Sequence, residues 1–501
     1  MNLYAALEAA CPPRGIAVEV ADTDLAYTWA DLRQGSALLA TLFTDLGLRP
    51  GERVMLQTDK SVEALMVWLA CLRAGLVLVP LNPAYQQAEL DHFLKDAEPR
   101  LLVCAPEAFH WASKRAFLNG VQWVFTLGTE RRGTLLDRAA QLMPRCRDEV
   151  LPRAPDDAAA ILYTSGTTGI SKGALLTHGN LLSNAQTLVA LWGFTPDDVL
   201  VHALPIFHVH GLFVASHCAL LSGSRLRWCP RFEPALVTQQ LRGATVFMGV
   251  PTLYTRLLSF AGFTREATAS IRLFVSGSAP LQAETFDAFT ARTGQVILER
   301  YGMSETGMLT SNPLKGERRR ASVGPALPGV QLRIAPSETG DADGVGAVEV
   351  KGPNVFGGYW KRPELKTTEF TPDGFFRTGD LGRLDPDGYL HLVGRAKDLV
   401  ITGGFNVYPA EVEGYLNALP GVQESAVIGL PHPDFGEAVT ALLVPQPGAT
   451  LDPDALLSTL RGQIAAFKCP KRLLVVADLP RNAMGKVQKK ALREQHAGLY
   501  A

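Results

Sequence analysis

Short apolar runs alternate with longer amphipathic segments over roughly the first 320 positions of the 501-residue chain. The runs that predict buried strands lie at 53–57, 76–81, 100–104, 246–250 and 273–276. Helical periodicity over 62–73 predicts a helix between the first two of them. Strand, helix and strand at this spacing indicate βαβ units and a parallel sheet. We therefore expect an α/β fold for this part of the chain.

Composition changes after about position 320, where glycine, proline and aspartate become dense. Strand and turn signals at 347–352, 374–380 and 389–394 predict a smaller β-rich subdomain. After a polar joint at 395–398, predicted helices at 411–418 and 456–464 alternate with predicted strands at 424–430 and 438–444. The sequence thus predicts a large N-terminal domain over 1–395, with α/β layers and the β-rich subdomain. A small mobile α+β domain follows over 396–501.

Charge and cysteine usage exclude several classes of protein. The formal net charge of −1 lacks the basic excess that a general nucleic-acid-binding protein needs. The seven cysteines are scattered without a CxxC pair, which favours a reduced cytoplasmic chain without a zinc site or disulfide framework. The N-terminus has no basic leader, and polar residues and prolines interrupt the apolar stretches at 64–81 and 201–221. We expect a cytoplasmic protein with no membrane partner.

Residues 163–173 combine glycines, hydroxyl groups and one lysine directly after an apolar run. The hydroxyl groups belong to Thr164, Ser165, Thr167 and Thr168, the glycines include Gly166 and Gly169, and the lysine is Lys172. Successive backbone N–H groups in such a loop form an anion-binding nest. It is not a Walker A loop, because GxxxxGK[ST] is absent. A flexible Ser/Gly linker is the alternative, but the position after a predicted strand favours a phosphate site.

Six segments in order resemble the motifs of the adenylate-forming superfamily of acyl-CoA synthetases, adenylation domains and luciferases. They lie at 163–173, 301–306, 378–380, 394–395, 403–409 and 480–486. This resemblance spans essentially the whole chain. It implies two half-reactions. ATP and a carboxylate first give an acyl-adenylate and pyrophosphate, and a thiol such as coenzyme A then displaces AMP.

The resemblance also implies roles for individual residues. Nucleotide binding falls to the phosphate loop, to Tyr301, Gly302, Met303, Ser304 and Thr306, and to Asp380 and Arg395 at the ribose. Glu305 and Thr168 are expected to ligate Mg²⁺, and a carboxylate is a ligand that this ion prefers. Lys486 is expected to neutralise charge as the substrate carboxylate attacks the α-phosphorus. Lys397 matches the hinge, with an ordinary surface lysine as its alternative. Gly403 and Gly404 match the loop at the coenzyme A tunnel.

Several cations fall in segments expected to form the acid pocket: Arg256, Arg300, His208 and His210. A small dicarboxylic acid needs a cationic partner for its second carboxylate, because an unpaired buried carboxylate is very costly. Arginine suits bidentate carboxylate capture. Each residue also has an ordinary interpretation. Arg256 could be a surface or ion-pairing residue of an amphipathic helix, Arg300 could pair with Glu299 or Glu305, and His208 could be a core histidine.

The segments around these cations are similar to those of the malonyl-CoA synthetases. In that family two arginines matching Arg256 and Arg300, with a serine matching Ser278, hold the second carboxylate of malonate or methylmalonate. A histidine at the position of His208 lies beside the reacting carboxylate in many superfamily members. The resemblance therefore implies an AMP-forming malonate–CoA ligase that uses ATP, Mg²⁺ and coenzyme A. Neither the choice between malonate and methylmalonate nor that between a monomer and a small homo-oligomer follows from the sequence.

Three other functions remain open at this stage. A ligase for short- or medium-chain monocarboxylic acids would share every motif except the arginine pair. An adenylating enzyme that loads the phosphopantetheine of a carrier protein would differ only in its acceptor. A non-catalytic nucleotide-binding protein is the third, and the joint presence of Lys486, Glu305 and Asp380 argues against it.

Overall fold

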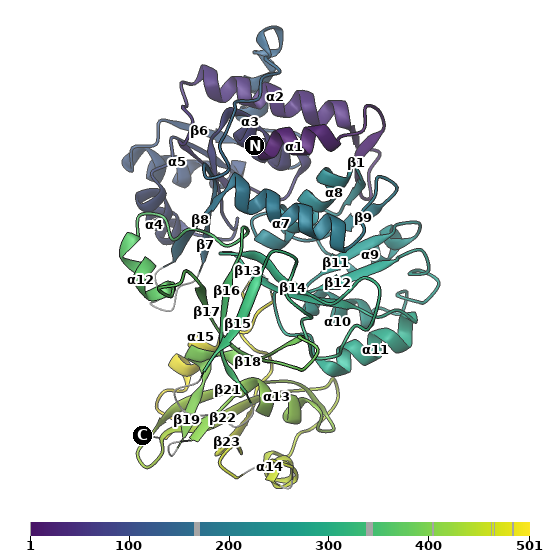
Figure 1. The fold of residues 1–501 in the computed structure, drawn as a ribbon, viewed down its shortest axis with the longest axis vertical. Helices are drawn as coiled ribbons and strands as arrows, with labels where there is room; N and C mark the ends of the chain where they lie inside the picture. The colour runs from purple at the N-terminus through teal and green to yellow at the C-terminus, as the bar shows by residue number, and fades with distance from the viewer. Residues whose placement is uncertain are drawn as a thin grey trace.

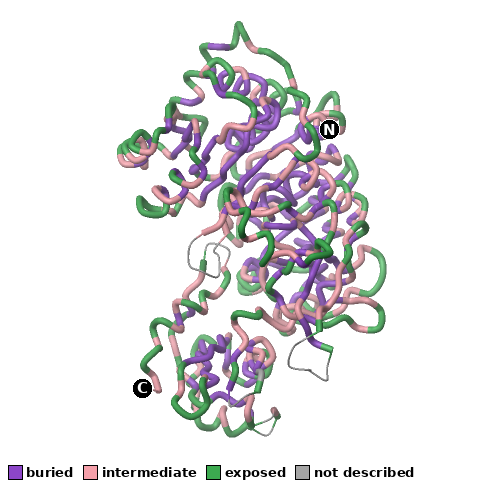
Figure 2. The backbone as a smooth tube through the Cα atoms, turned by 60° about the vertical axis from the view of Figure 1, so that its left-hand side comes forward, coloured by how far each residue is buried: buried purple, intermediate pink, exposed green. Residues whose placement is uncertain are grey.

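The computed structural model describes residues 2–164, 171–336, 344–402, 405–461, 463–464, 466–482 and 485–500. A large body contains the N-terminal and central parts of the chain, and a smaller body contains the C-terminal part (Figure 1). Buried residues gather separately within each body, and mostly exposed or half-buried chain connects them (Figure 2). No helix within the described ranges is long and apolar enough to cross a bilayer.

The first sheet confirms the predicted βαβ pattern. Its strand order is β6-β5-β3-β4-β7-β8, parallel throughout except for the antiparallel last pair. The strands are β3 (Arg53–Gln57), β4 (Val77–Pro80), β5 (Leu101–Cys104), β6 (Trp123–Thr126), β7 (Ala158–Thr164) and β8 (Lys172–Thr177). The helices around it are α2 (Trp29–Asp45), α3 (Val62–Ala74), α4 (Gln87–Ala97), α5 (Phe109–Leu118) and α6 (Thr134–Ala140). Helix α3 is buried on every side, which explains its nearly unbroken apolar sequence.

The second sheet has the order β14-β13-β12-β11-β9-β10-β1-β2. Its strands are β1 (Ile16–Val20), β2 (Ala26–Thr28), β9 (Val199–His202), β10 (Arg225–Trp228), β11 (Val246–Gly249), β12 (Leu273–Ser276), β13 (Leu298–Met303) and β14 (Gly307–Ser311). The associated helices are α1 (Leu3–Ala10), α7 (His178–Leu191), α8 (Ser216–Ser222), α9 (Pro234–Leu241), α10 (Pro251–Leu258) and α11 (Ala283–Thr293). A π-helix, His210–Ala215, precedes α8 directly. Residues of both sheets share one large hydrophobic core.

The predicted β-rich subdomain is a four-stranded antiparallel sheet. It contains β15 (Gln331–Ala335), β16 (Gly346–Lys351), β17 (Phe376–Leu384) and β18 (Leu390–Arg395), and the short helix α12 (Lys366–Glu369) precedes β17. Strand β18 ends at the polar joint, where Ala396–Asp398 form one 3₁₀ turn. The last residue of this sheet is therefore also the first residue of the connection to the C-terminal body.

The C-terminal body has a sheet and hydrophobic clusters of its own. Its elements are β19 (Val400–Thr402), β20 (Phe405–Val407), α13 (Pro409–Asn417), β21 (Val422–His432), β22 (Gly436–Pro445), α14 (Pro453–Arg461), β23 (Arg472–Val475) and α15 (Lys489–Gln495). Helix α14 begins and ends three residues earlier than predicted. The Asp452 side chain accepts hydrogen bonds from the N–H groups of Asp454 and Ala455, so it caps the helix at this earlier position.

Candidate active site

Glu305 lies in the tight turn between β13 and β14. Its side chain is buried, and Oε1 accepts hydrogen bonds from Thr164 Oγ1 at 3.2 Å and from the Tyr359 hydroxyl at 3.0 Å. Burial raises the pKa of Glu305 above its ordinary value. A Cβ at Gly302 would lie 2.2 Å from the Gly307 carbonyl oxygen, so glycine is required in this turn. The structure thus holds an acidic side chain at the end of β7, where the glycine-rich loop begins.

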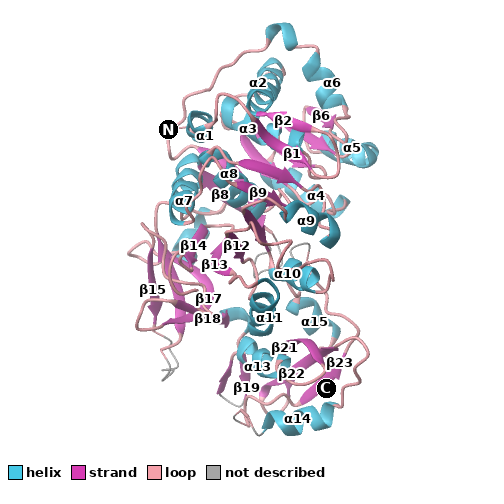
Figure 3. Cartoon of the chain, turned by 90° about the vertical axis from the view of Figure 1, so that its right-hand side faces the viewer, coloured by secondary structure: helices cyan, strands magenta, loops and turns pink. Residues whose placement is uncertain are grey.

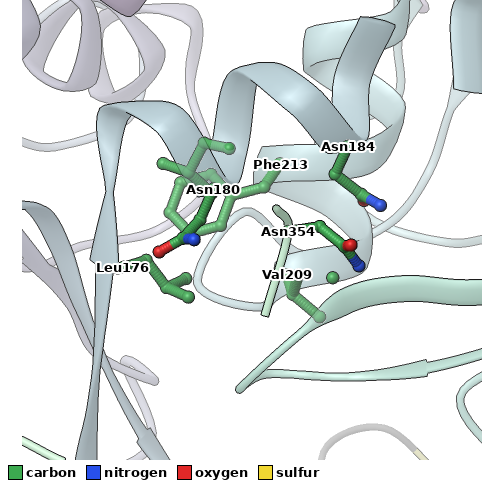
Figure 4. A pocket seen from close by; sticks show the side chains of 8 residues that line it. Leu176, Asn180, Asn184, Val209, Phe213 and Asn354 are labelled. Atoms are coloured by element: carbon green, nitrogen blue, oxygen red, sulfur yellow. The ribbon is translucent and has the colours of Figure 1, made fainter. Parts of the chain in front are cut away.

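Two asparagines support this turn, and the sequence did not predict them. Asn184 accepts from the Met308 N–H at 3.0 Å and donates to the Met308 carbonyl at 2.9 Å. Asn354 donates to the carbonyls of Thr306 and Met308 at 2.8 and 3.0 Å. Both side chains border a cavity of about 10 Å³ (Figure 4). A cavity of that size holds at most one water, so it is too small to receive a substrate. The two asparagines therefore stabilise the turn that carries Glu305.

Asp380 and Arg395 face each other across the β17–β18 pair. The Arg395 Nε lies 2.6 Å from Asp380 Oδ1, and the buried Tyr301 hydroxyl donates to the other carboxylate oxygen. The structure therefore brings the expected ribose pair to the expected adenine segment. The rest of that segment occupies the end of β13 and the turn, with Gly302, Met303 and Ser304 half-buried and Thr306 buried.

Lys172 is the first residue of β8, directly after the glycine-rich loop. Its Nζ donates to Glu369 Oε1 of α12 at 2.9 Å and lies 5.0 Å from the centre of the Tyr359 ring. Tyr359 in turn donates to Glu305, so one aromatic side chain contacts both charged groups. The sequence-predicted loop residues Ser165, Gly166, Thr167, Thr168 and Gly169 lie outside the described residues.

Arg300 is a fully buried arginine for which the described residues provide no hydrogen-bond partner at Nε, Nη1 or Nη2. Its guanidinium packs against Gly277, where a Cβ would lie 2.6 Å from Cζ. Glu299 is its neighbour on the strand, so the two side chains point to opposite faces. Glu299 accepts instead from the Leu281 N–H at 3.3 Å. Burial lowers the pKa of Arg300 to about 10, so it remains charged at neutral pH.

Ser278, which follows Gly277, and His210 lie beside this guanidinium, and His208 lies near His210. Ser278 adopts a left-handed backbone conformation with φ of 76°, a strain that concentrates at functional sites. Its Oγ lies 3.5 Å from His210 Nδ1. Burial, followed by the charge of Arg300, lowers the pKa of His210 well below its ordinary value. Burial lowers the pKa of His208 to about 4, and its Nε2 also lacks a partner among the described residues. Both histidines are therefore neutral at pH 7.

Arg256 lies on the exposed face of α10, with its guanidinium 4.7 Å from the centre of the Phe232 ring. Tyr254 and Leu257 of the same helix are buried, and Tyr254 donates to the Val275 carbonyl at 2.7 Å. Arg256 on α10 and Arg300 on β13 thus differ in burial.

Lys486 extends from a tight turn of the C-terminal body. Asn482 and Lys486 exchange two hydrogen bonds, at 2.9 and 3.0 Å, and Arg481 donates to the Gly485 carbonyl at 2.9 Å. Helices α10 and α11 lie next to this body (Figure 3). Desolvation at the junction, followed by the charge of Arg395, lowers the pKa of Lys486 to about 8. Its side chain still reaches solvent, as a group that must meet a substrate does.

The two remaining predicted features lie at the connection between the bodies. Lys397 is exposed in the 3₁₀ turn, and its neighbour Asp398 pairs with Arg493 of α15 at 2.8 Å. Gly403 and Gly404 lie outside the described residues, between β19 and β20. The contact between Asp398 and Arg493 secures this joint to the C-terminal body.

Two family models match the chain in the order of these sites. The model described as AMP-binding enzyme matches residues 7–360, and the model described as AMP-binding enzyme C-terminal domain matches residues 411–486. The chain belongs to the AMP-binding enzyme family. Residues that the site brings together in the large body, Thr164, Glu305 and Tyr359, fall within the first match, and Lys486 is the last residue of the second.

Similarity to several members of the AMP-binding enzyme family extends over 90% or more of this chain. The ATP-bound structure of MatB from Rhodopseudomonas palustris is 51% identical, with a TM-score of 0.96 over 100% of this chain and 99% of that one. The apo structure of the same protein, with the same coverage, gives a TM-score of 0.83. The malonate–CoA ligase of Arabidopsis thaliana is 35% identical over 90% of this chain and 79% of its own length. A feruloyl-CoA synthase of Amycolatopsis is 36% identical over 94% of each chain.

Identity and coverage are the same for the two MatB structures, so the whole chain superposes more closely on the ATP-bound structure than on the apo structure. In the present structure the turn that carries Lys486 packs closely on α10, since a Cβ at Gly485 would lie 2.6 Å from Thr252 Oγ1.

Proposed function

We propose that this AMP-binding enzyme is an acid–thiol ligase that joins malonate to coenzyme A through an acyl-adenylate. The observation that carries the proposal is the buried guanidinium of Arg300 beside Ser278 and His210, which has no hydrogen-bond partner among the described residues. A buried arginine without a counter-ion is costly, and a dianionic acid supplies the missing partner. Similarity to MatB and to a malonate–CoA ligase supports the same substrate. Methylmalonate, which carries a 2-methyl group, belongs to the same substrate class.

In the first half-reaction the distal carboxylate of the acid binds Arg300, with Ser278 donating and Arg256 adding a second, more exposed positive charge. His208 is neutral, so it can hydrogen-bond to the reacting carboxylate without forming an ion pair that would weaken its nucleophilicity. An oxygen of that carboxylate attacks the α-phosphorus, and the bond to pyrophosphate breaks. Lys486 stabilises the charge that develops on the α-phosphoryl oxygens.

ATP is held by residues from three parts of the large body. The phosphate loop with Thr164 and Lys172 binds the phosphates, and the segment at 301–306 lines the adenine. Asp380 accepts hydrogen bonds from the ribose hydroxyls, and Arg395 fixes the orientation of that carboxylate. The ion pair between Lys172 and Glu369 keeps the lysine at the mouth of the loop until phosphate oxygens replace the carboxylate.

Mg²⁺ is part of this proposal. Within the ranges that the structure describes, no group of three His, Cys, Asp or Glu side chains could hold a metal ion by itself. The buried Glu305 carboxylate fits the usual mode for this ion, which takes one or two protein oxygens together with substrate phosphates. Glu305 and Thr168 would hold it. When bound, the ion neutralises charge on the phosphates.

In the second half-reaction the thiol sulfur of coenzyme A attacks the carbonyl carbon of the adenylate, and AMP leaves. We assign residues 1–395 to the N-terminal domain and 396–501 to a C-terminal domain that turns about Lys397 between the steps. Rotation withdraws Lys486 and brings Gly403 and Gly404 to the site, where glycine leaves room for the pantetheine arm. The exposure of Lys397 between two compact bodies supports this hinge.

The scattered cysteines support a cytoplasmic location, and the chain is proposed to act as a monomer or a small homo-oligomer.

The proposed ligase activity is tested by a pyrophosphate-release assay with ATP, Mg²⁺ and coenzyme A. The acids are acetate, propionate, malonate, methylmalonate, succinate, octanoate and ferulate. Preference for malonate or methylmalonate supports the proposal. Preference for a monocarboxylic acid overturns the roles of Arg256 and Arg300. Pyrophosphate release without saturation by free coenzyme A indicates a carrier-protein acceptor instead.

A further inference from the structure

Lys60 is a half-buried lysine in the loop between β3 and α3, and none of the roles proposed above uses it. Its ammonium donates to His202 Nδ1 at 3.0 Å, to the His202 carbonyl at 2.7 Å and to the Cys229 carbonyl at 2.8 Å. It also lies 4.5 Å from the centre of the Trp228 ring. Over the described ranges it has no carboxylate within ion-pair distance. Each of the three N–H groups of the Lys60 ammonium thus has an acceptor. These contacts join the loop after β3 of the first sheet to the ends of β9 and β10 in the second.

The Gly211 carbonyl fixes the tautomer of His202. A carbonyl can only accept, so the ring proton resides on Nε2, which donates to this carbonyl at 3.0 Å, with Ser216 Oγ at 3.2 Å. Nδ1 therefore accepts from Lys60. Burial lowers the pKa of Lys60 to about 7, and the three acceptors around its Nζ favour the protonated form. The ring is held in plane by stacking on Trp228, with centroids 4.7 Å apart. Burial, followed by the charge of Lys60, lowers the pKa of His202 well below its ordinary value, so the ring is neutral.

The Gly211 carbonyl is the point at which the π-helix is held. It accepts from His202 Nε2, from Ser216 Oγ at 2.9 Å and from the backbone N–H of Ser216, five residues along the chain. The last of these is the hydrogen bond that defines a π-helix, a form that is rare and concentrates at functional sites. A Cβ at Gly211 would lie 2.0 Å from the Pro205 carbonyl oxygen, so the chain is also packed tightly on its other side.

The π-helix begins with His210, which lies beside Ser278 and the guanidinium of Arg300. His208 precedes it by two residues, and its carbonyl accepts from the Leu212 N–H at 3.0 Å within the same turn. We propose that Lys60 and His202 are positioning residues, which hold the π-helix in the rotation that points His208 and His210 into the acid pocket. The identity of that pocket rests on the proposed function.

Replacement of Lys60 should weaken acid binding through its effect on His202. In Lys60→Met the Nδ1 atom loses its donor, so the ring can protonate there and present a lone pair to the Gly211 carbonyl. His202→Phe removes the contact entirely. His202→Gln keeps a donor for the carbonyl and an acceptor for the lysine. A positioning role therefore predicts that the first two variants lose acid binding and that the third retains most of it.

The experiment measures KM for malonate and for ATP in these three variants and in Trp68→Phe. The last variant loses another buried hydrogen bond of the same core, from Trp68 Nε1 to His217 Nε2 at 3.0 Å, and does not touch the Gly211 carbonyl. It keeps an aromatic ring at the position that packs on Phe213 of the π-helix, so it controls for loss of a buried hydrogen bond beside this helix. We expect Lys60→Met and His202→Phe to raise the KM for malonate by roughly tenfold, while the KM for ATP changes less than about twofold. His202→Gln and Trp68→Phe should leave both values near the wild type.

Equal changes in both KM values, or no change in a folded His202→Phe, would overturn the positioning role. Thermal unfolding of each variant identifies any that do not fold, and the His202→Phe and His202→Gln pair decides the matter if Lys60→Met is one of them. Failure of the proposed function is a separate result. It appears as a wild-type enzyme that prefers another acid, and the same comparison is then made with that acid.

Discussion

Gly485 and Thr252 come so close that a single Cβ at Gly485 would lie 2.6 Å from the Thr252 hydroxyl oxygen. One residue belongs to the lysine-bearing turn of the C-terminal body and the other to the first turn of α10. The φ of Gly485 is 73°, a value that also favours glycine. Contact between the two bodies, and hence the position of Lys486, depends on the absence of a side chain at this point.

Gly485→Ala should therefore slow adenylation while sparing the later step. The added methyl group meets Thr252 only when the C-terminal body is in the present arrangement, so we expect pyrophosphate release to fall by roughly tenfold or more. Thioester formation from preformed malonyl-adenylate should change less than about threefold.

Two variants make this test specific. Gly414→Ala, at an open helical position of the same body, should leave both half-reactions unchanged. Thr252→Ala combined with Gly485→Ala leaves only the Thr252 Cβ, 3.2 Å away, and should recover part of the adenylation rate. No recovery would mean that backbone strain at Gly485, rather than the contact with α10, causes the loss.

Lys486 gives a prediction about pH. Its pKa is lowered to about 8, and it must be protonated to stabilise negative charge, so kcat/KM for adenylation should fall as the pH rises through about 8. The reaction from preformed adenylate should lack this inflection. Lys486→Ala should abolish pyrophosphate release while largely preserving thioester formation from preformed adenylate. Equal loss of both half-reactions in that variant would contradict the alternation of the two bodies.

Arg300 should be needed for binding rather than for folding. Its guanidinium is buried and finds no hydrogen-bond partner in the part of the chain that the structure describes, so Arg300→Met removes a desolvated charge and should not lower the unfolding temperature strongly. The KM for malonate should rise by roughly 30-fold or more, as loss of a buried charged partner costs about 2–5 kcal/mol, with the KM for ATP nearly unchanged.

Arg256→Met is the matched comparison for Arg300→Met. Arg256 is exposed, where solvent screens charge, so its removal should raise the KM for malonate by a smaller factor, of about three- to tenfold. A larger effect at Arg256 than at Arg300 would contradict the assignment of the buried guanidinium as the main carboxylate partner. Steady-state kinetics with both acids, malonate and propionate, would also reveal any gain in monocarboxylate use.

The sequence predicted features formed by neighbouring residues better than contacts between segments far apart in the chain. The strands at 53–57 and 273–276 were correct to the residue because a local apolar run determines a buried strand. Segments carrying Glu305 and Asp380 were found because the residues of each motif are adjacent in sequence. Helix α14 was misplaced because the capping role of Asp452 was not recognised.

Contacts between distant segments left no such pattern. Glu369 lies 197 positions from Lys172, and Lys60 lies 142 positions from His202, so both contacts depend on how distant elements pack together. The left-handed φ of Ser278 has no local signal either, because serine does not favour that region. Only the structure shows that Arg300 is buried and Arg256 is exposed, although the 3.6-residue periodicity around Tyr254 and Leu257 is consistent with an exposed residue at 256.

Glu299 provides a prediction about stability. Burial raises its pKa to about 8, whereas the same carboxyl in an unfolded chain ionises near 4.5. Between these values the native state keeps a proton that the unfolded state has released, so the unfolded state binds fewer protons and the free energy of unfolding falls as pH rises. This contribution is absent below about pH 4.5 and reaches its full destabilising effect above about pH 8.

Glu299→Gln removes the titrating group but keeps an acceptor for the Leu281 N–H. We expect its stability relative to the wild type to improve by roughly 2–4 kcal/mol between pH 5 and pH 8, an order-of-magnitude value from the shift in pKa. Thermal unfolding midpoints measured across this range provide the check, with Glu284→Gln, at an exposed position of α11, as the control. A stability difference that stays constant with pH would show that Glu299 is ionised in the native protein, and that burial at this strand does not hold its proton.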